Sequence, residues 1–120
     1  MLNNVNAAFA DAFALPSRVA IYIPSTTDTN HTADNSRLVE YVAATLSRLF
    51  GGATSQSASG FWMSDKCGLV AEAVTIVYAN ATPEALDTHA ATLRNIAERI
   101  KTEMRQEAVS VEINGTLFIV

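Results

Sequence analysis

Hydrophobic residues recur along this chain with two different periods, and the order in which the two alternate leaves few folds open. β-branched and aromatic runs indicate strands, whereas apolar residues three or four positions apart indicate helices. In chain order, the pattern predicts a strand at 18–24, a helix at 36–50, strands at 53–63 and 69–79, a helix at 82–104, and strands at 109–113 and 116–120. We therefore expect an α+β fold of β-α-β-β-α-β order with a short additional C-terminal strand. The simplest such fold is a ferredoxin-like sandwich, with two helices on one face of an antiparallel sheet.

Short capping and turn signals mark the ends of these elements. Gly51 follows the first predicted helix, where a residue in the left-handed conformation is common. Thr82 and Pro83 stand at the start of the second helix, as cap and first helical residue. Asn114-Gly115, between two β-rich runs, is typical of a two-residue hairpin turn. These signals support the element boundaries independently of the hydrophobic pattern.

The chain length favours one domain. A chain of 120 residues is close to the common size of a single domain. We expect a single ferredoxin-like domain at 17–120, preceded by an N-terminal segment at 1–16. In that segment Val5, Phe9 and Phe13 fall at helical spacing, and no basic residue leads it as in a secretion signal. The segment therefore predicts a short helix or an oligomerisation arm.

Composition and charge exclude some classes of function. Eight Lys and Arg residues against twelve Asp and Glu give a net charge of −4, which argues against nucleic acid as a partner. No stretch reaches the 18 continuous apolar residues of a membrane span, so we expect no membrane partner. The single cysteine, Cys67, suits a reducing compartment. We therefore expect a cytoplasmic protein.

A polar loop follows the first predicted strand and contains three groups that could bind a cation. Asp28, His31 and Asp34 are evenly spaced, but the spacing matches no established ligand pattern. A solvated loop is the interpretation that composition favours, and a metal or substrate loop is the alternative. We assign no metal and no cofactor.

Aromatic residues of the strands are further candidates for binding. A ferredoxin-like sheet has one face that no helix covers, and such a face often binds a second subunit or a ligand. Tyr22, Trp62 and Tyr78 are candidates for it, although alternation alone does not say which of them face the helices. For Trp62, packing in the core and a role in an interface or pocket both remain open.

Two reactive side chains lie outside these groups. His89 falls on the apolar stripe of the second predicted helix, where it is either a core histidine or an acid–base group. Cys67 follows Lys66 in a turn, and a neighbouring cation favours a thiolate. No base or oxyanion site accompanies either residue in the sequence, so we assign no catalytic residue.

Three short segments carry a resemblance to known proteins. They are Ala20-Ile21-Tyr22-Ile23-Pro24-Ser25-Thr26, Leu49-Phe50-Gly51-Gly52-Ala53-Thr54 and Gly60-Phe61-Trp62. In this order they resemble small uncharacterised proteins carried by phages and plasmids, and are similar to the DUF3574-type ferredoxin-like proteins. The similarity covers Val19 to about Val120 and implies no known active site. A mobile-element association implies an accessory or anti-defence protein that acts by binding.

The sequence thus favours a non-catalytic binding module that occupies a protein partner. We expect a homodimer or a higher homo-oligomer, and a protein partner. Two alternatives stay open. One is a small dimeric α+β barrel enzyme that uses His31, His89 or Tyr22. The other is a protein that sequesters a small ligand such as a nucleotide.

Overall fold

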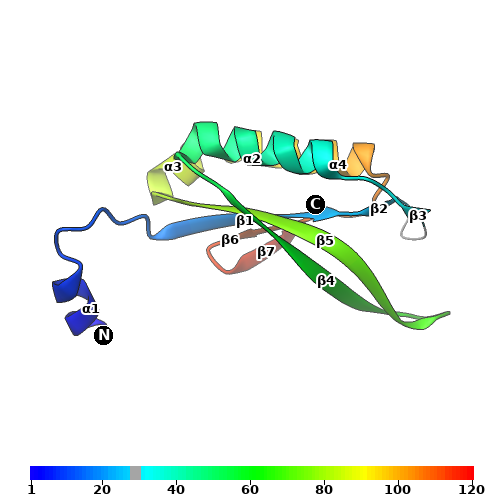
Figure 1. Ribbon diagram of the computed structural model, residues 1–120, viewed down its shortest axis with the longest axis horizontal. Helices are drawn as coiled ribbons and strands as arrows, with labels where there is room; N and C mark the ends of the chain where they lie inside the picture. The colour runs from blue at the N-terminus through cyan, green and yellow to red at the C-terminus, as the bar shows by residue number, and fades with distance from the viewer. Residues whose placement is uncertain (28–30) are drawn as a thin grey trace.

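A five-stranded antiparallel sheet forms the body of the computed structural model, which describes residues 1–27 and 31–120. Its strand order is β4-β5-β1-β6-β7 (Figure 1). The strands are β1 (Ser17–Pro24), β4 (Thr54–Ser64), β5 (Gly68–Ala81), β6 (Ser110–Ile113) and β7 (Thr116–Ile119). Three helices lie over one face of this sheet, namely α2 (Ser36–Phe50), α3 (Pro83–Thr88) and α4 (Ala90–Glu103). The predicted α+β class, with an antiparallel sheet covered by helices on one face, is confirmed.

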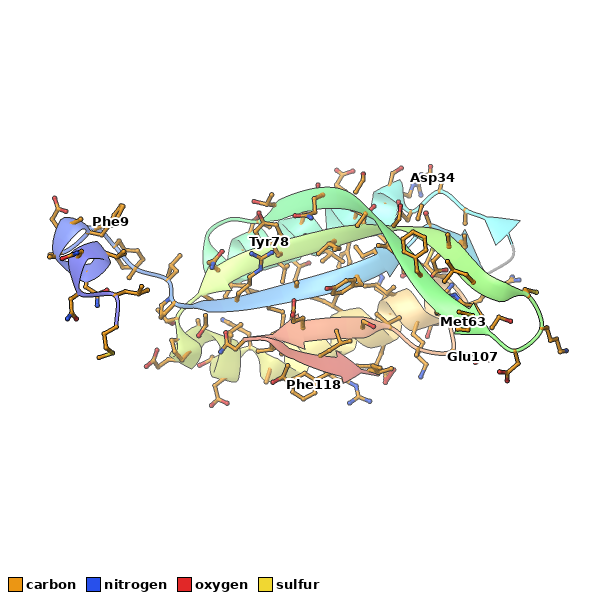
Figure 2. All side chains as sticks on the ribbon, turned by 90° about the horizontal axis from the view of Figure 1, so that it is seen from below. Phe9, Asp34, Met63, Tyr78, Glu107 and Phe118 are labelled. Carbon is orange, nitrogen blue, oxygen red and sulfur yellow. The ribbon has the colours of Figure 1, made fainter. Side chains whose placement is uncertain are left out.

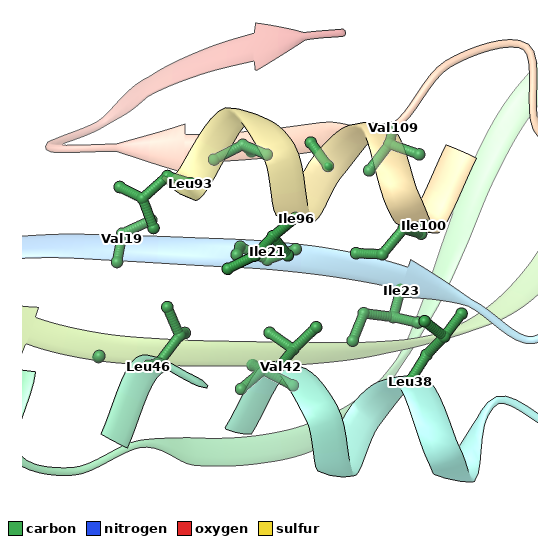
Figure 3. Packing of buried hydrophobic residues seen from close by; sticks show 14 of the residues in the cluster. Val19, Ile21, Ile23, Leu38, Val42, Leu46, Leu93, Ile96, Ile100 and Val109 are labelled. Atoms are coloured by element: carbon green, nitrogen blue, oxygen red, sulfur yellow. The ribbon is translucent and has the colours of Figure 1, made fainter. Parts of the chain in front are cut away.

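The core lies between β1 and the two long helices. Val19, Ile21 and Ile23 alternate along β1 and are completely buried against α2 and α4 (Figure 3). Val42 of α2 and Ile96 of α4 belong to the same cluster, one from each helix (Figure 3). The period of two in the strand and the period of 3.6 in the helices therefore bring their apolar faces together.

Helix α2 begins and ends as the sequence predicts. It spans Ser36–Phe50, and Gly51 follows it in the left-handed conformation with φ of 94°. Glycine adopts this conformation without the steric cost that a side chain adds. At the C-terminal hairpin, Asn114 and Gly115 both have positive φ, as a type I′ turn requires.

The second predicted helix is divided in two. Thr82 caps α3 by accepting a hydrogen bond from the Ala85 amide at 3.1 Å, and the chain leaves helical geometry at His89 before α4 begins. Leu86 and Leu93 are both buried, one on each side of the break. A spacing of seven residues fits an unbroken helix equally well, so periodicity could not reveal the break.

Two smaller segments also differ from prediction. The polar loop after β1 contains two short paired strands, β2 (Thr26–Thr27) and β3 (His31–Thr32). Helix α1 spans only Asn3–Ala8, is shorter than the apolar spacing indicates, and buries none of its residues. No helix in the described part of the chain is both long and apolar enough to cross a membrane.

Truncating Ile21 tests the assignment of the core. We expect Ile21→Ala to lower the free energy of unfolding by about 2–5 kcal/mol, because it opens a cavity beneath both long helices. Ile119→Ala is the matched control, since Ile119 is 69% exposed on β7, and we expect a change within about 0.5 kcal/mol. Urea denaturation followed by circular dichroism measures both, and equal losses would contradict this core.

Candidate functional site

The face of the sheet opposite the helices is open, and its side chains are set by strand register. Tyr22 lies between Ile21 and Ile23, so it points away from the core. It is paired directly with Ile76 of β5, and residues paired in this way share a face. Figure 2 shows this face, with Tyr78 on it. We call it the open face.

A groove of about 260 Å³ crosses the open face where β1, β4 and β5 meet the segment after α4. We call it the open-face groove. It is lined by Tyr22 of β1, by Gly60 and Trp62 of β4, by Glu72 and Val74 of β5, and by Gln106. Its walls combine aromatic rings, aliphatic side chains and one carboxylate, which is the composition typical of small-molecule sites.

Hydrogen bonds through Thr26 position the carboxylate of the groove. The Thr26 hydroxyl donates to Glu72 Oε2 at 3.1 Å, and the Thr26 carbonyl accepts from Gln106 Nε2 at 2.8 Å. The same Gln106 amide also donates to the Met104 carbonyl at 3.1 Å, just after α4. Strand β2 therefore connects Glu72 on the sheet to the chain that leaves the helix layer.

Trp62 and Tyr22 are the two predicted binding residues that the structure brings into this groove. Trp62 is 43% exposed, so the interpretation that packs it in the core is wrong. Its partner across the hairpin is Val70, on a part of β4–β5 that reaches beyond the helices (Figure 1). Its exposed surface within the groove leaves the ring accessible to a ligand.

Tyr78 lies on the open face but outside the groove. The Arg18 guanidinium stands 3.7 Å from the centre of its ring, so the face of this tyrosine is occupied by a cation of the same chain. Tyr78 also lines a second cavity, together with Phe13 and Gly51, at the other end of the sheet. It is therefore not part of the same site as Tyr22 and Trp62.

Of the three polar-loop candidates, Asp34 is the one whose side chain the structure describes, and it is not among the groove residues. Asp34 is exposed and accepts hydrogen bonds from the Ser36 amide at 2.9 Å and from the Ser36 hydroxyl, at the start of α2. Asp34 therefore satisfies the first amide of α2 from the position before Asn35, the N-cap residue. His31 lies on β3, paired with Thr27, and Asp28 falls outside the described residues.

The two reactive side chains are not among the groove-lining residues. His89 is half-buried at the junction of α3 and α4 and meets the Phe50 ring edge-on, with centroids 5.8 Å apart. Cys67 is exposed in the turn between β4 and β5. The barrel-enzyme alternative therefore retains Tyr22 but not His89 among its proposed groups.

Glu72 and Gln106 are the polar groove residues that the sequence analysis missed. Glu72 belongs to the alternating set Glu72, Val74, Ile76 and Tyr78, which the register of β5 places on one face. That alternation could have identified Glu72 in the sequence, because an acid within an apolar run is rare and needs a polar environment. Gln106 follows a helix end and carried no comparable signal.

Similar folds occur in solved structures. A phage SAM lyase in complex with S-methyl-5′-thioadenosine is similar with a TM-score of 0.64 and 16% identity, over 87% of this chain and 88% of that chain. A phage SAM lyase in the apo state gives a TM-score of 0.60 and 15% identity, over 87% of each chain. No family model matches the sequence, and no curated protein does.

These neighbours correct the prediction of function. The sequence favoured a non-catalytic binding module over an enzyme, whereas both solved neighbours with this fold are lyases, and one holds a small ligand. The preference for a non-catalytic module is therefore wrong. The alternative of a small α+β enzyme agrees better with the shared fold and with the open-face groove.

The pKa of Asp34 tests its contact with Ser36 at the start of α2. The hydrogen bonds from Ser36 hold the pKa of the Asp34 carboxyl below its usual range, with Arg37 adding a smaller effect. Because the folded pKa is lowered, the stabilisation is present above the unfolded pKa and is lost as pH falls through the folded pKa. We expect Ser36→Ala to raise the pKa of Asp34 toward its ordinary value, measured by NMR titration of its side-chain carboxyl carbon. The backbone amide bond remains in this variant, so an unchanged pKa would contradict the hydrogen bond from the Ser36 hydroxyl.

Proposed function

We propose that this protein is a lyase that cleaves S-adenosylmethionine in the open-face groove. The observation that carries the proposal is the convergence of Tyr22, Trp62 and Glu72 on one groove. The fold shared with the phage SAM lyases adds support, although function depends on the site and not on the fold.

The substrate has three features that this groove matches. Its adenine ring is flat, and aromatic side chains such as Trp62 stack on flat rings. Its sulfonium and ammonium groups are cations, which aromatic faces and carboxylates attract. Glu72 is the acid among the groove residues, so we assign it the binding of a substrate cation. A volume of about 260 Å³ is slightly below the range of about 300–1,000 Å³ for ligand sites, so the groove encloses only part of the substrate.

The proposed reaction breaks the bond between sulfur and the four-carbon amino-acid chain. The bonding electron pair stays on sulfur, which becomes the neutral thioether of S-methyl-5′-thioadenosine. Two routes balance without water. Either the substrate's own carboxylate attacks the departing carbon and forms a lactone, or the Glu72 carboxylate accepts a proton from the chain, which then forms an alkene. In both routes Tyr22, Trp62 and Glu72 bind and orient the substrate while its positive charge disappears.

The detailed topology is part of the same proposal. We infer that residues 17–120 form a ferredoxin-like domain. The order β4-β5-β1-β6, with α2 and the α3–α4 pair as the two connections on one face, supports this inference. Strand β7 then adds to the edge of the sheet beside β6.

Removing the charge of Glu72 tests the site. Wild-type protein incubated with S-adenosylmethionine should release S-methyl-5′-thioadenosine, which chromatography with mass detection quantifies. We expect Glu72→Gln to reduce kcat/KM roughly 10- to 150-fold, since a hydrogen bond to a charged group contributes about 1.5–3 kcal/mol. Glu40→Gln, an exposed carboxylate on α2, is the control and should keep full activity. Mass detection of the second product, lactone or alkene, identifies the route. Absence of release by the wild type, or equal activity of Glu72→Gln, would overturn the proposal.

The single tryptophan reports binding directly. Trp62 is the one tryptophan of the chain and lines the groove, so its fluorescence follows events there. We expect titration with S-methyl-5′-thioadenosine to change the emission in a saturable way, because the adenine ring covers an indole that is 43% exposed. Methionine, which lacks the adenine ring, should leave the emission unchanged. If the thioadenosine gives no saturable change, the ligand does not bind beside Trp62.

A further inference from the structure

A second, more apolar groove lies at the other edge of the molecule. It has a volume of about 360 Å³ and runs between α3–α4 and the β6–β7 hairpin. We call it the α4–β7 groove, and it is lined by Leu86, Ala90, Leu93, Arg94, Phe118 and Val120, among others. Phe118 is 51% exposed there (Figure 2). An apolar concavity of this kind is typical of a site that binds another apolar surface.

The N-terminal arm, residues 1–16, provides such a surface. Leu2, Val5 and Phe9 are 69%, 48% and 66% exposed, and the helix that carries Val5 buries no residue. Figure 1 shows α1 standing apart from the body of the protein, connected to β1 by an extended segment. A helix of six residues is not stable in water by itself, so the arm needs a partner.

The arm does not run toward the α4–β7 groove of its own chain. Phe13 and Leu15, at its base, line the cavity shared with Gly51 and Tyr78, on the side of β4 and β5. The α4–β7 groove lies beyond β6, on the other side of the central strand β1. The chain therefore leaves the domain on the side away from its own groove.

We propose that the occupant of the α4–β7 groove is the N-terminal arm of a second copy of this chain, in a closed assembly of which a dimer with exchanged arms is the smallest form. This proposal does not rest on the lyase activity. It also supplies a specific contact for the homo-oligomer that the sequence predicts.

The area of the contact is sufficient for a stable dimer. Phe9 and Phe13 are 66% and 86% exposed, so burying them removes about 230–380 Å² of arm surface from water. The groove loses a comparable area, so two reciprocal contacts bury roughly 900–1,500 Å², which overlaps the range of stable interfaces. The groove lining carries one cation, Arg94, and one acid, Asp87. Asp11 is the acid of the arm, and Arg94 is the group in the groove that can pair with it, because its present pair with Glu98 is exposed and of a type that contributes little.

Paired substitutions on α4 test the groove. Native mass spectrometry and sedimentation of the wild-type chain should show a dimer or a larger closed assembly. Ala90→Glu places a charge in the groove, whereas Ala91→Glu places the same charge at the next exposed position, which is not among the groove residues. We expect at least a tenfold weaker association for Ala90→Glu and no change for Ala91→Glu.

The arm is tested in the same full-length chain. Phe9→Ser with Phe13→Ser should also weaken association at least tenfold, with unchanged thermal stability of the monomer, because both side chains are exposed. A monomeric wild type, or an assembly that neither the arm nor the Ala90→Glu variant weakens, overturns the proposal.

A disulfide distinguishes exchange between copies from folding back within one chain. In a Cys67→Ser background, chains carrying Phe9→Cys are mixed with chains carrying Ala90→Cys and then oxidised. We expect a covalent heterodimer on a non-reducing gel. The chain carrying both cysteines should form covalent dimers or larger closed species. If that double variant instead cross-links only within one chain, the arm occupies its own groove and the proposal is wrong.

Discussion

Strand β1 is hydrogen-bonded on both edges, and the rest of the molecule is arranged around it. It pairs with β5 from Ser17 to Pro24 and with β6 through Val19, Ala20 and Ile21. Burial at three alternating positions provides the hydrophobic contact that holds α2 and α4 on the sheet. Because the strand cannot shift by one residue without exposing that set, its register is strongly specified. The same register places Tyr22, which lies at an intervening position, on the open face.

This arrangement separates the residues that stabilise the fold from those of the candidate site. The helix-facing positions of the sheet form the core. The intervening positions, such as Tyr22, carry the side chains of the open face. The Glu72–Thr26–Gln106 connection is what ties the open-face groove to the helix layer. A likeness at 16% identity shows the fold alone, so the assignment of function has to rest on the groove itself.

The sequence predicted those features whose signals are local. Helix α2, its left-handed Gly51 and the Asn114-Gly115 turn depend on residues within one element, and all three agree with the structure. The break at His89 was missed, because Leu86 and Leu93 fit either geometry.

The site was predicted in part. Tyr22 and Trp62 were candidates on aromatic character alone, but their meeting with Glu72 depends on the pairing of three strands, which one-dimensional patterns do not contain. Asp34 was a candidate because of its charge in a polar loop, and the structure adds a local contact, in which it accepts a hydrogen bond from the first amide of α2.

The two grooves occupy different sides of the same sheet, and this placement has a consequence for how assembly and binding relate. The α4–β7 groove contains Phe118, whose strand partner Val111 belongs to the helix-facing core. The open-face groove contains Tyr22, which points the opposite way. An arm bound in the first groove therefore leaves Tyr22 and Trp62 accessible. Ligand binding and arm exchange then share no residue. The two grooves do share strand β6 (Ser110–Ile113), which lines the α4–β7 groove with Val111 and the open-face groove with Ser110, so this strand is the direct route for coupling between them.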